Sequence, residues 1–132
     1  MPVESILETS RAAMAYERAR MEVASRNIAS TNVPLAPGQV AQRWKAPLAD
    51  GMHFDSVVLR QSAQSMEQVG VREIQQPGHP YADEAGQVRY PDVDMTIEMT
   101  TMISASRGYE ANVRAFNLLR GMMLRGLEIG AK

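Results

Sequence analysis

The sequence predicts a mainly α fold with a small β insert, in which long N- and C-terminal helices pack antiparallel as a coiled-coil-like pair. Three observations lead to this prediction. Apolar residues recur at a helical period near the C-terminus, they do so again near the N-terminus, and the segment between has turn residues and short strand-like runs. We expect residues 1–33 and 92–132 to form a terminal-helix domain, and residues 34–91 to form a small β-rich insert with turn-rich linkers.

The C-terminal helix is predicted from Asp92 to Leu127. A helix of about 33 residues is roughly 50 Å long, whereas a compact domain of this chain's length is roughly 36 Å across. The apolar stripe should therefore extend beyond any globule that the chain forms, and we expect another subunit to cover it. Its members are Met95, Met102, Tyr109, Phe116 and Met123, which stand seven apart, with Met99, Ile103, Val113 and Leu127 beside them.

Three glycines interrupt the predicted C-terminal helix, at Gly108, Gly121 and Gly126. Each costs about 1 kcal/mol relative to alanine inside a helix. This cost indicates either close packing or a bend, or else a weakness that is tolerated because the helix is held from outside.

An N-terminal helix is predicted from Glu4 to about Ser30. Small residues flank its apolar stripe and permit a second helix to approach closely. The helix ends in residues 27–38, where two asparagines, two prolines and a glycine favour turns. Its stripe completes the expected subunit interface with Leu7, Met14, Met21 and Ile28, which stand seven apart.

The middle segment has no helical stripe. Trp44 and Phe54 are the best candidates for its core, and Pro77-Gly78-His79-Pro80 predicts a rigid corner. Asp92 or Asp94 is placed to cap the C-terminal helix. The candidate strands are residues 40–46, 54–59 and 66–74, with a weaker one at 87–90.

Composition excludes several classes of function. The 14 basic and 15 acidic residues are interspersed and give a formal net charge of −1, so no basic surface for nucleic acid is expected. Cysteine is absent, which excludes disulfides and thiolate metal sites. No apolar run approaches the roughly 18 residues that span a bilayer, and the N-terminus lacks the layout of a cleaved signal. We expect no nucleic-acid partner and no direct lipid binding.

The sequence also lacks a catalytic constellation. His53 and His79 are the only histidines, and the turn residues around His79 argue against a ligand-bearing helix. Asp92 and Asp94 are better explained as acids at a helix start than as a catalytic pair. No nucleophile elbow, phosphate-binding glycine loop or nucleotide fingerprint is present. We expect no catalytic residues, no metal site, no cofactor and no enzymatic activity.

One set of residues is specific enough to suggest a family. In chain order its members are Asn27, Asn32, Pro77, Gly78, His79, Pro80, Asp94, Ser104, Ser106, Arg107 and Asn112. This order resembles the FlgC family, the proximal-rod proteins of the bacterial flagellar basal body. The resemblance touches both ends of the chain and carries little into residues 39–76. Asp92 stands where the family usually has asparagine, and Gly108 where it has alanine.

The resemblance implies a structural subunit of the proximal rod, which polymerises through its terminal helices into the hollow drive shaft that transmits torque. The implied partners are further copies, other flagellar rod proteins, and membrane-ring and export-gate components of the basal body. The implied location is the rod crossing the periplasm, reached through the flagellar type III apparatus without a cleaved signal peptide. The alternative hypothesis is a soluble helical adaptor or export chaperone that binds a client helix.

Overall fold

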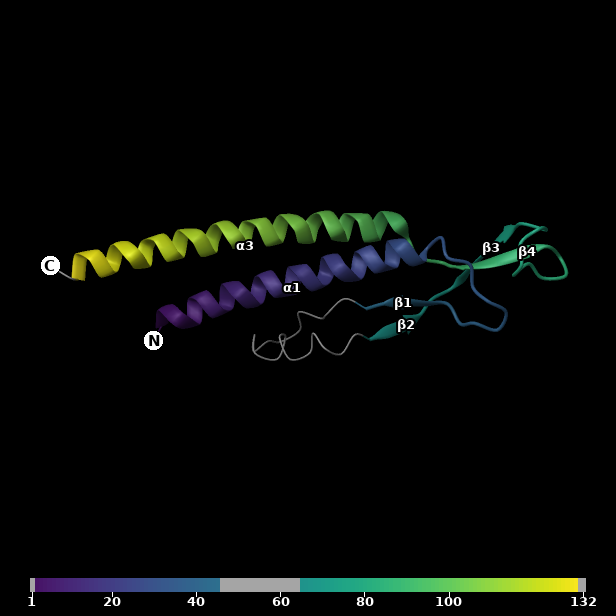
Figure 1. Cartoon of the computed structure of the whole chain (residues 1–132), viewed down its shortest axis with the longest axis horizontal. Coiled ribbons are helices and arrows are strands. Elements are labelled where there is room, and N and C mark those ends of the chain that lie inside the picture. The colour runs from purple at the N-terminus through teal and green to yellow at the C-terminus, as the bar shows by residue number, and fades with distance from the viewer. Residues whose placement is uncertain (1, 46–64, 131–132) are drawn as a thin grey trace.

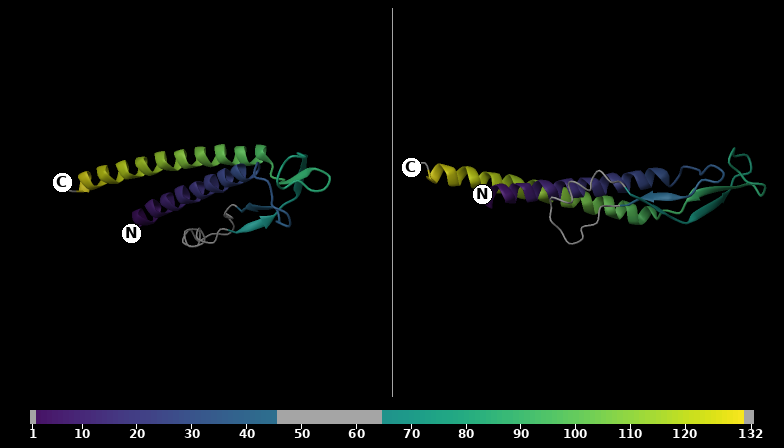
Figure 2. Two further views of the ribbon diagram at one scale, coloured as in Figure 1. Left: turned by 45° about the vertical axis from the view of Figure 1, so that its right-hand side comes forward. Right: turned by 90° about the horizontal axis from the view of Figure 1, so that it is seen from below.

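The computed structural model describes residues 2–45 and 65–130 (Figure 1). Its two helices lie side by side and antiparallel. One pair of strands extends the molecule at one end, and the other pair lies beside the end of the N-terminal helix (Figures 1 and 2). The predicted mainly α fold with a β insert between two terminal helices is confirmed. In chain order the elements are α1 (Pro2–Ser30), β1 (Gln42–Trp44), β2 (Met66–Gln68), β3 (Val71–Gln75), β4 (Gln87–Pro91) and α3 (Met95–Gly130).

The end of α1 is closed by hydrogen bonds to one carbonyl group. The hydroxyls of Ser30 and Thr31 both donate to the main-chain oxygen of Asn27, at 2.9 Å. The Thr31 main-chain N–H also donates to this oxygen, at 3.2 Å. Pro34 follows and cannot continue the helical hydrogen bonding. The predicted end of the first helix is confirmed.

Asp94 caps the start of α3. Its Oδ1 accepts hydrogen bonds from the N–H groups of Thr96, at 2.9 Å, and Ile97, at 3.2 Å. Asp92 plays a different part, because its own main-chain N–H donates to the carbonyl of Gly70 at 2.9 Å. Of the two aspartates that the sequence offered, Asp94 is therefore the cap.

Asp94→Ala is expected to lower the free energy of unfolding by about 1 kcal/mol, because two N–H groups at the start of α3 lose their acceptor. Chemical denaturation of the purified protein, followed by circular dichroism, measures the change. Asp92→Ala is the matched control and should cost clearly less. Equal losses from the two variants would contradict the assignment of the cap.

The strands form two separate antiparallel pairs, β1 with β2 and β3 with β4. The predicted single strand at residues 66–74 is wrong, since it contains both β2 and β3. Between β2 and β3 the main chain bonds to other segments. The Val69 N–H donates to the Ala41 carbonyl at 3.1 Å, and the Gly70 carbonyl accepts from the Asp92 N–H. The predicted strand at 54–59 and the core candidate Phe54 lie outside the described residues.

The core of the insert surrounds β4. Val88 is fully buried there, and Leu35 from the segment after α1 joins the strand through its N–H, which donates to the Arg89 carbonyl at 2.8 Å. Trp44 does not lie in this core. It is half-buried beside α1, with the Arg26 guanidinium 5.0 Å from the centre of its ring. The other buried apolar residues of this core are Ala41, Tyr90, Pro91 and Val93.

The long axis of the molecule has two different poles. At one pole α1 begins and α3 ends, and at the other the turn between β3 and β4 projects away from the helices (Figure 1). This turn contains the predicted corner. There the His79 main-chain N–H donates to the Gln76 carbonyl, and the Tyr81 N–H donates to the ring Nδ1 of His79, both at 3.0 Å. Among the described helices, none has the length and apolarity to cross a membrane.

Candidate subunit interface

Small buried residues let α1 and α3 pack closely. Ala24 and Ala105 are at most 1% exposed, and Ala12 is also buried. Small side chains at a helix contact allow the two backbones to approach. The antiparallel pairing brings the start of α1 beside the end of α3, where the Arg11 guanidinium lies 5.9 Å from the centre of the Phe116 ring.

The two series with seven-residue spacing occupy half-buried positions. This holds for Leu7, Met14, Met21 and Ile28 of α1 and for Met95, Met102, Tyr109, Phe116 and Met123 of α3. Val113 is half-buried as well, whereas Met99, Ile103 and Leu127 are exposed. Packing within the chain thus covers part of the predicted subunit interface. The role of these residues between subunits stays a prediction.

Gly108 lies where the helices come close. A Cβ added there would stand 2.9 Å from the carboxyl group of Glu17 on α1, so a larger residue would require that side chain to move. Close packing therefore accounts for Gly108. It does not account for Gly121 or Gly126, since an added Cβ would meet nothing within 4 Å at either position.

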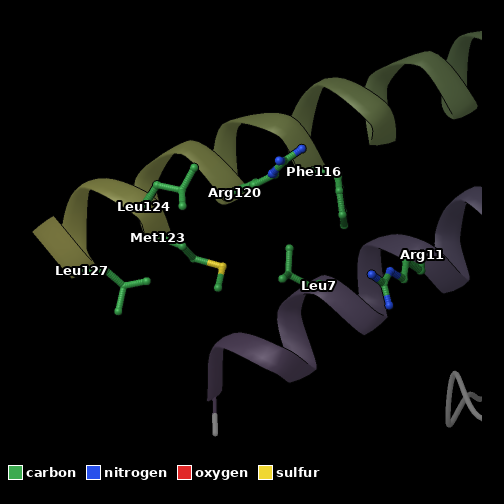
Figure 3. Close-up of a pocket in the computed structure, with 7 residues that line it drawn as sticks. All are labelled: Leu7, Arg11, Phe116, Arg120, Met123, Leu124 and Leu127. Carbon is green, nitrogen blue, oxygen red and sulfur yellow. The ribbon is translucent and has the colours of Figure 1, made fainter.

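An apolar groove of about 420 Å³ opens between the helices toward the pole where α1 begins (Figure 3). Leu7 on α1 and Met123 and Leu127 on α3 point into the space between the two helices. An apolar groove between two helices fits the apolar side of a third. The full lining is Leu7, Arg11, Phe116, Arg120, Met123, Leu124 and Leu127, and we call this feature the groove.

The same part of α3 carries a second apolar surface on its other side. Leu118, Met122 and Ile129 are 66%, 61% and 79% exposed, and we call them the outer stripe. At about 100° per residue, the outer stripe stands on the order of 150° from the groove-lining side of α3. The apolar stripe predicted from the sequence did not include Met122 or Ile129. Leu118, Met122 and Ile129 stand four and then seven residues apart, and this helical spacing indicates that they share one side of the helix.

Asn27 joins α1 to the first strand. Its side chain is 1% exposed and makes two hydrogen bonds to the main chain of Trp44. The Trp44 N–H donates to Asn27 Oδ1 at 2.8 Å, and Asn27 Nδ2 donates to the Trp44 carbonyl at 3.0 Å. The amide group thus satisfies both main-chain polar groups of Trp44, as a neighbouring strand would.

Two arginines also tie the insert to the helices. Arg43 of β1 pairs with Glu67 across the hairpin, and its Nη1 lies 3.5 Å from Oε1 of Glu98, a buried acid in the first turn of α3. Arg72 of β3 donates to the main-chain oxygen of Thr31, just after α1, at 3.2 Å. Each helix therefore has its own polar link to the insert.

The remaining residues of the family pattern are spread along the molecule. Ser104, Arg107 and Asn32 are exposed, and Ser106 and Asn112 are half-buried. The turn with Pro77, Gly78, His79 and Pro80 lies at the far pole, away from α3 (Figure 1). The structure does not gather these residues into one site. In the described ranges, no three histidine, aspartate or glutamate side chains stand close enough to hold a metal ion.

Comparison with known proteins gives a consistent result. The family model described as flagellar basal body rod FlgEFG protein C-terminal matches residues 84–129. The flagellar basal-body rod protein FlgC of Salmonella typhimurium is 31% identical over 140 residues, which cover 98% of this chain and 99% of the relative. The FlgC proteins of Yersinia enterocolitica and Bacillus subtilis are 34% and 33% identical. They cover 98% and 94% of this chain, and 99% and 95% of their own lengths.

Proposed function

The chain belongs to the FlgC family of flagellar basal-body rod proteins, and we propose that it polymerises into the rod through the surfaces of its two terminal helices. It is a structural component of the bacterial flagellar basal body, and it assembles with other flagellar rod proteins. The observation that carries the proposal is the apolar surface left on the helix pair. Large apolar side chains of α3 are exposed on more than one side of that helix.

Burial of this surface between subunits would stabilise the polymer. One large apolar side chain contributes about 1.5–3 kcal/mol when it is moved from water into a packed interface. The exposed residues of α3 include Met99, Ile103 and the outer stripe, so several are available in each subunit. Closely packed interfaces resist deformation, because their side chains interdigitate with little free volume. This supports a role in which the subunits transmit torque.

The arrangement of the elements supports a finer proposal. Residues 1–33 and 92–132 form the inner part of a hollow drive shaft, and residues 34–91 face outward from it. The protein occupies the proximal rod in the periplasm, next to further copies, other rod proteins, and membrane-ring and export-gate components. The flagellar type III apparatus exports it.

Phe116→Asp is expected to abolish motility and incorporation into the rod. Phe116 lines the groove, and a carboxylate there removes apolar contact and places charge in an interface. Arg11 lies beside this position and offers a partner to the carboxylate, so we expect the isolated chain to keep its helices. Swimming in soft agar and immunoblots of isolated basal bodies measure the two losses. We expect the same result for Tyr109→Asp.

Arg114→Glu is the control for charge on the same helix. Arg114 is 82% exposed at its side chain and makes a long ion pair with Glu110, at 3.8 Å. This variant should keep most of its motility, since an exposed pair contributes little. A strain in which Arg114→Glu stops swimming and Phe116→Asp swims normally would contradict the surface that we assign.

A further inference from the structure

From the groove and the outer stripe we infer that they are the two halves of one contact, in which the outer stripe of each copy lies in the groove of the next copy. This inference rests on the proposed function and adds to it the identity of the occupant, namely a second copy of this chain. It also fixes which side of α3 meets which side of its neighbour.

Both halves of the contact lie on one stretch of helix. The groove is lined by α3 residues between Phe116 and Leu127, and the outer stripe runs from Leu118 to Ile129. The two surfaces are therefore offset along the axis by about two residues, or roughly 3 Å. Parallel copies placed side by side at nearly the same height bring the stripe of one to the level of the groove of the other.

The outer stripe and the groove-lining side of α3 face in roughly opposite directions. A copy whose groove is filled by one neighbour still presents its own stripe on the far side. Such a heterologous contact leaves every copy with one free half, so it repeats into a ring or an open helical polymer. Two copies that met stripe to stripe would instead close into a dimer and stop.

Charged residues of both signs stand near both surfaces. Arg11 and Arg120 border the groove, with the exposed Glu8 one residue from Leu7. Arg125 and Glu128 are exposed on the same stretch of α3 as the outer stripe. Both edges thus carry both signs, and opposite charges are available on each side of the contact. The long stem of an arginine can cover apolar surface while its charged end stays in water.

The test uses disulfide formation, for which the chain is well suited because it has no native cysteine. A double variant, Leu7→Cys with Met122→Cys, places one thiol in the groove and one on the outer stripe. A strain producing this variant is treated with a mild oxidant, and its basal bodies are isolated. We expect a ladder of linked species at multiples of the 14.6 kDa chain mass on a non-reducing gel.

Matched controls separate this contact from accidental linkage. Leu7→Cys alone and Met122→Cys alone should give no linked dimer, which is the largest species that a chain with one cysteine can form. A second control, Leu7→Cys with Glu110→Cys, places the second thiol on an exposed part of α3 outside the outer stripe and should also give none. Met123→Cys with Leu118→Cys tests the same contact from α3 only. It replaces the first pair if Leu7→Cys impairs folding.

Three outcomes would overturn the inference. A double variant that is present in basal bodies but gives no ladder shows that the two surfaces do not meet. A linked dimer from Met122→Cys alone shows that stripe packs on stripe, and a link to a different rod protein shows that the occupant is not a second copy. Absence of the unmodified chain from basal bodies would instead refute the proposed function, so the two failures are distinguishable.

Discussion

Ala105→Asp is expected to lower the free energy of unfolding by about 3–5 kcal/mol, the largest loss that we predict for a single change in the helix pair. Ala105 has no exposed surface and lies on α3 where it packs against α1. A carboxylate at this position would be buried without a partner or would force the helices apart. Either outcome removes the packing on which two long helices depend in water.

Circular dichroism during chemical denaturation measures this loss. Ala111→Asp is the matched control, since it makes the same change at an exposed position on the same helix. Its cost should be limited to the lower helix propensity of aspartate, which is less than about 1 kcal/mol. Similar losses in the two variants would show that Ala105 does not face α1 in solution.

Asn27→Asp is expected to release the β1–β2 hairpin from α1 while both helices remain folded. The carboxylate still accepts from the Trp44 N–H, but it has no donor for the Trp44 carbonyl, and its charge is buried. An unpaired buried acceptor together with a buried charge costs about 2–4 kcal/mol. We therefore expect fast hydrogen exchange at the Trp44 amide and a shift in the fluorescence of the single tryptophan.

Asn32→Asp makes the same substitution five residues later, at an exposed position. It should leave the Trp44 amide protected and the fluorescence unchanged. If Asn27→Asp also left that amide protected, the link between α1 and β1 would have to rest on the arginine contacts instead. Loss of helical signal in Asn27→Asp would contradict the separation of the hairpin from the helix pair.

The helices could be predicted from the sequence because their cause is local. A seven-residue apolar period is a property of neighbouring residues, and it located both helices to within a few residues of their observed ends. Asp94 was one of two possible caps, since both aspartates precede the helix. The choice between them depends on Gly70, which engages the main chain of Asp92 and is distant in sequence.

The insert was harder to predict because its contacts are long-range. Residues 66–74 have the composition of one strand, and only the pairing of Val69 and Gly70 with distant segments divides it. The role of Asn27 was likewise hidden. Its helix-ending position was evident, but its two hydrogen bonds join it to Trp44, which lies 17 residues away.

The candidate interface was predicted in part. The seven-residue series marked the side of each helix that is apolar, and the structure places those residues half-buried in the pair. A single sequence cannot tell which apolar side a helix uses within the chain and which it leaves to a neighbour. The outer stripe is separate from the groove because α1 packs against the other side of α3.

The position of the two helix ends has a practical consequence for imaging. Since α1 begins and α3 ends at the same pole, a fluorescent protein fused to either terminus would crowd the region where we place the contact between copies (Figure 1). The turn around Glu84 lies at the opposite pole and is exposed. A short epitope inserted there should report the position of each subunit in a living cell while the drive shaft continues to rotate.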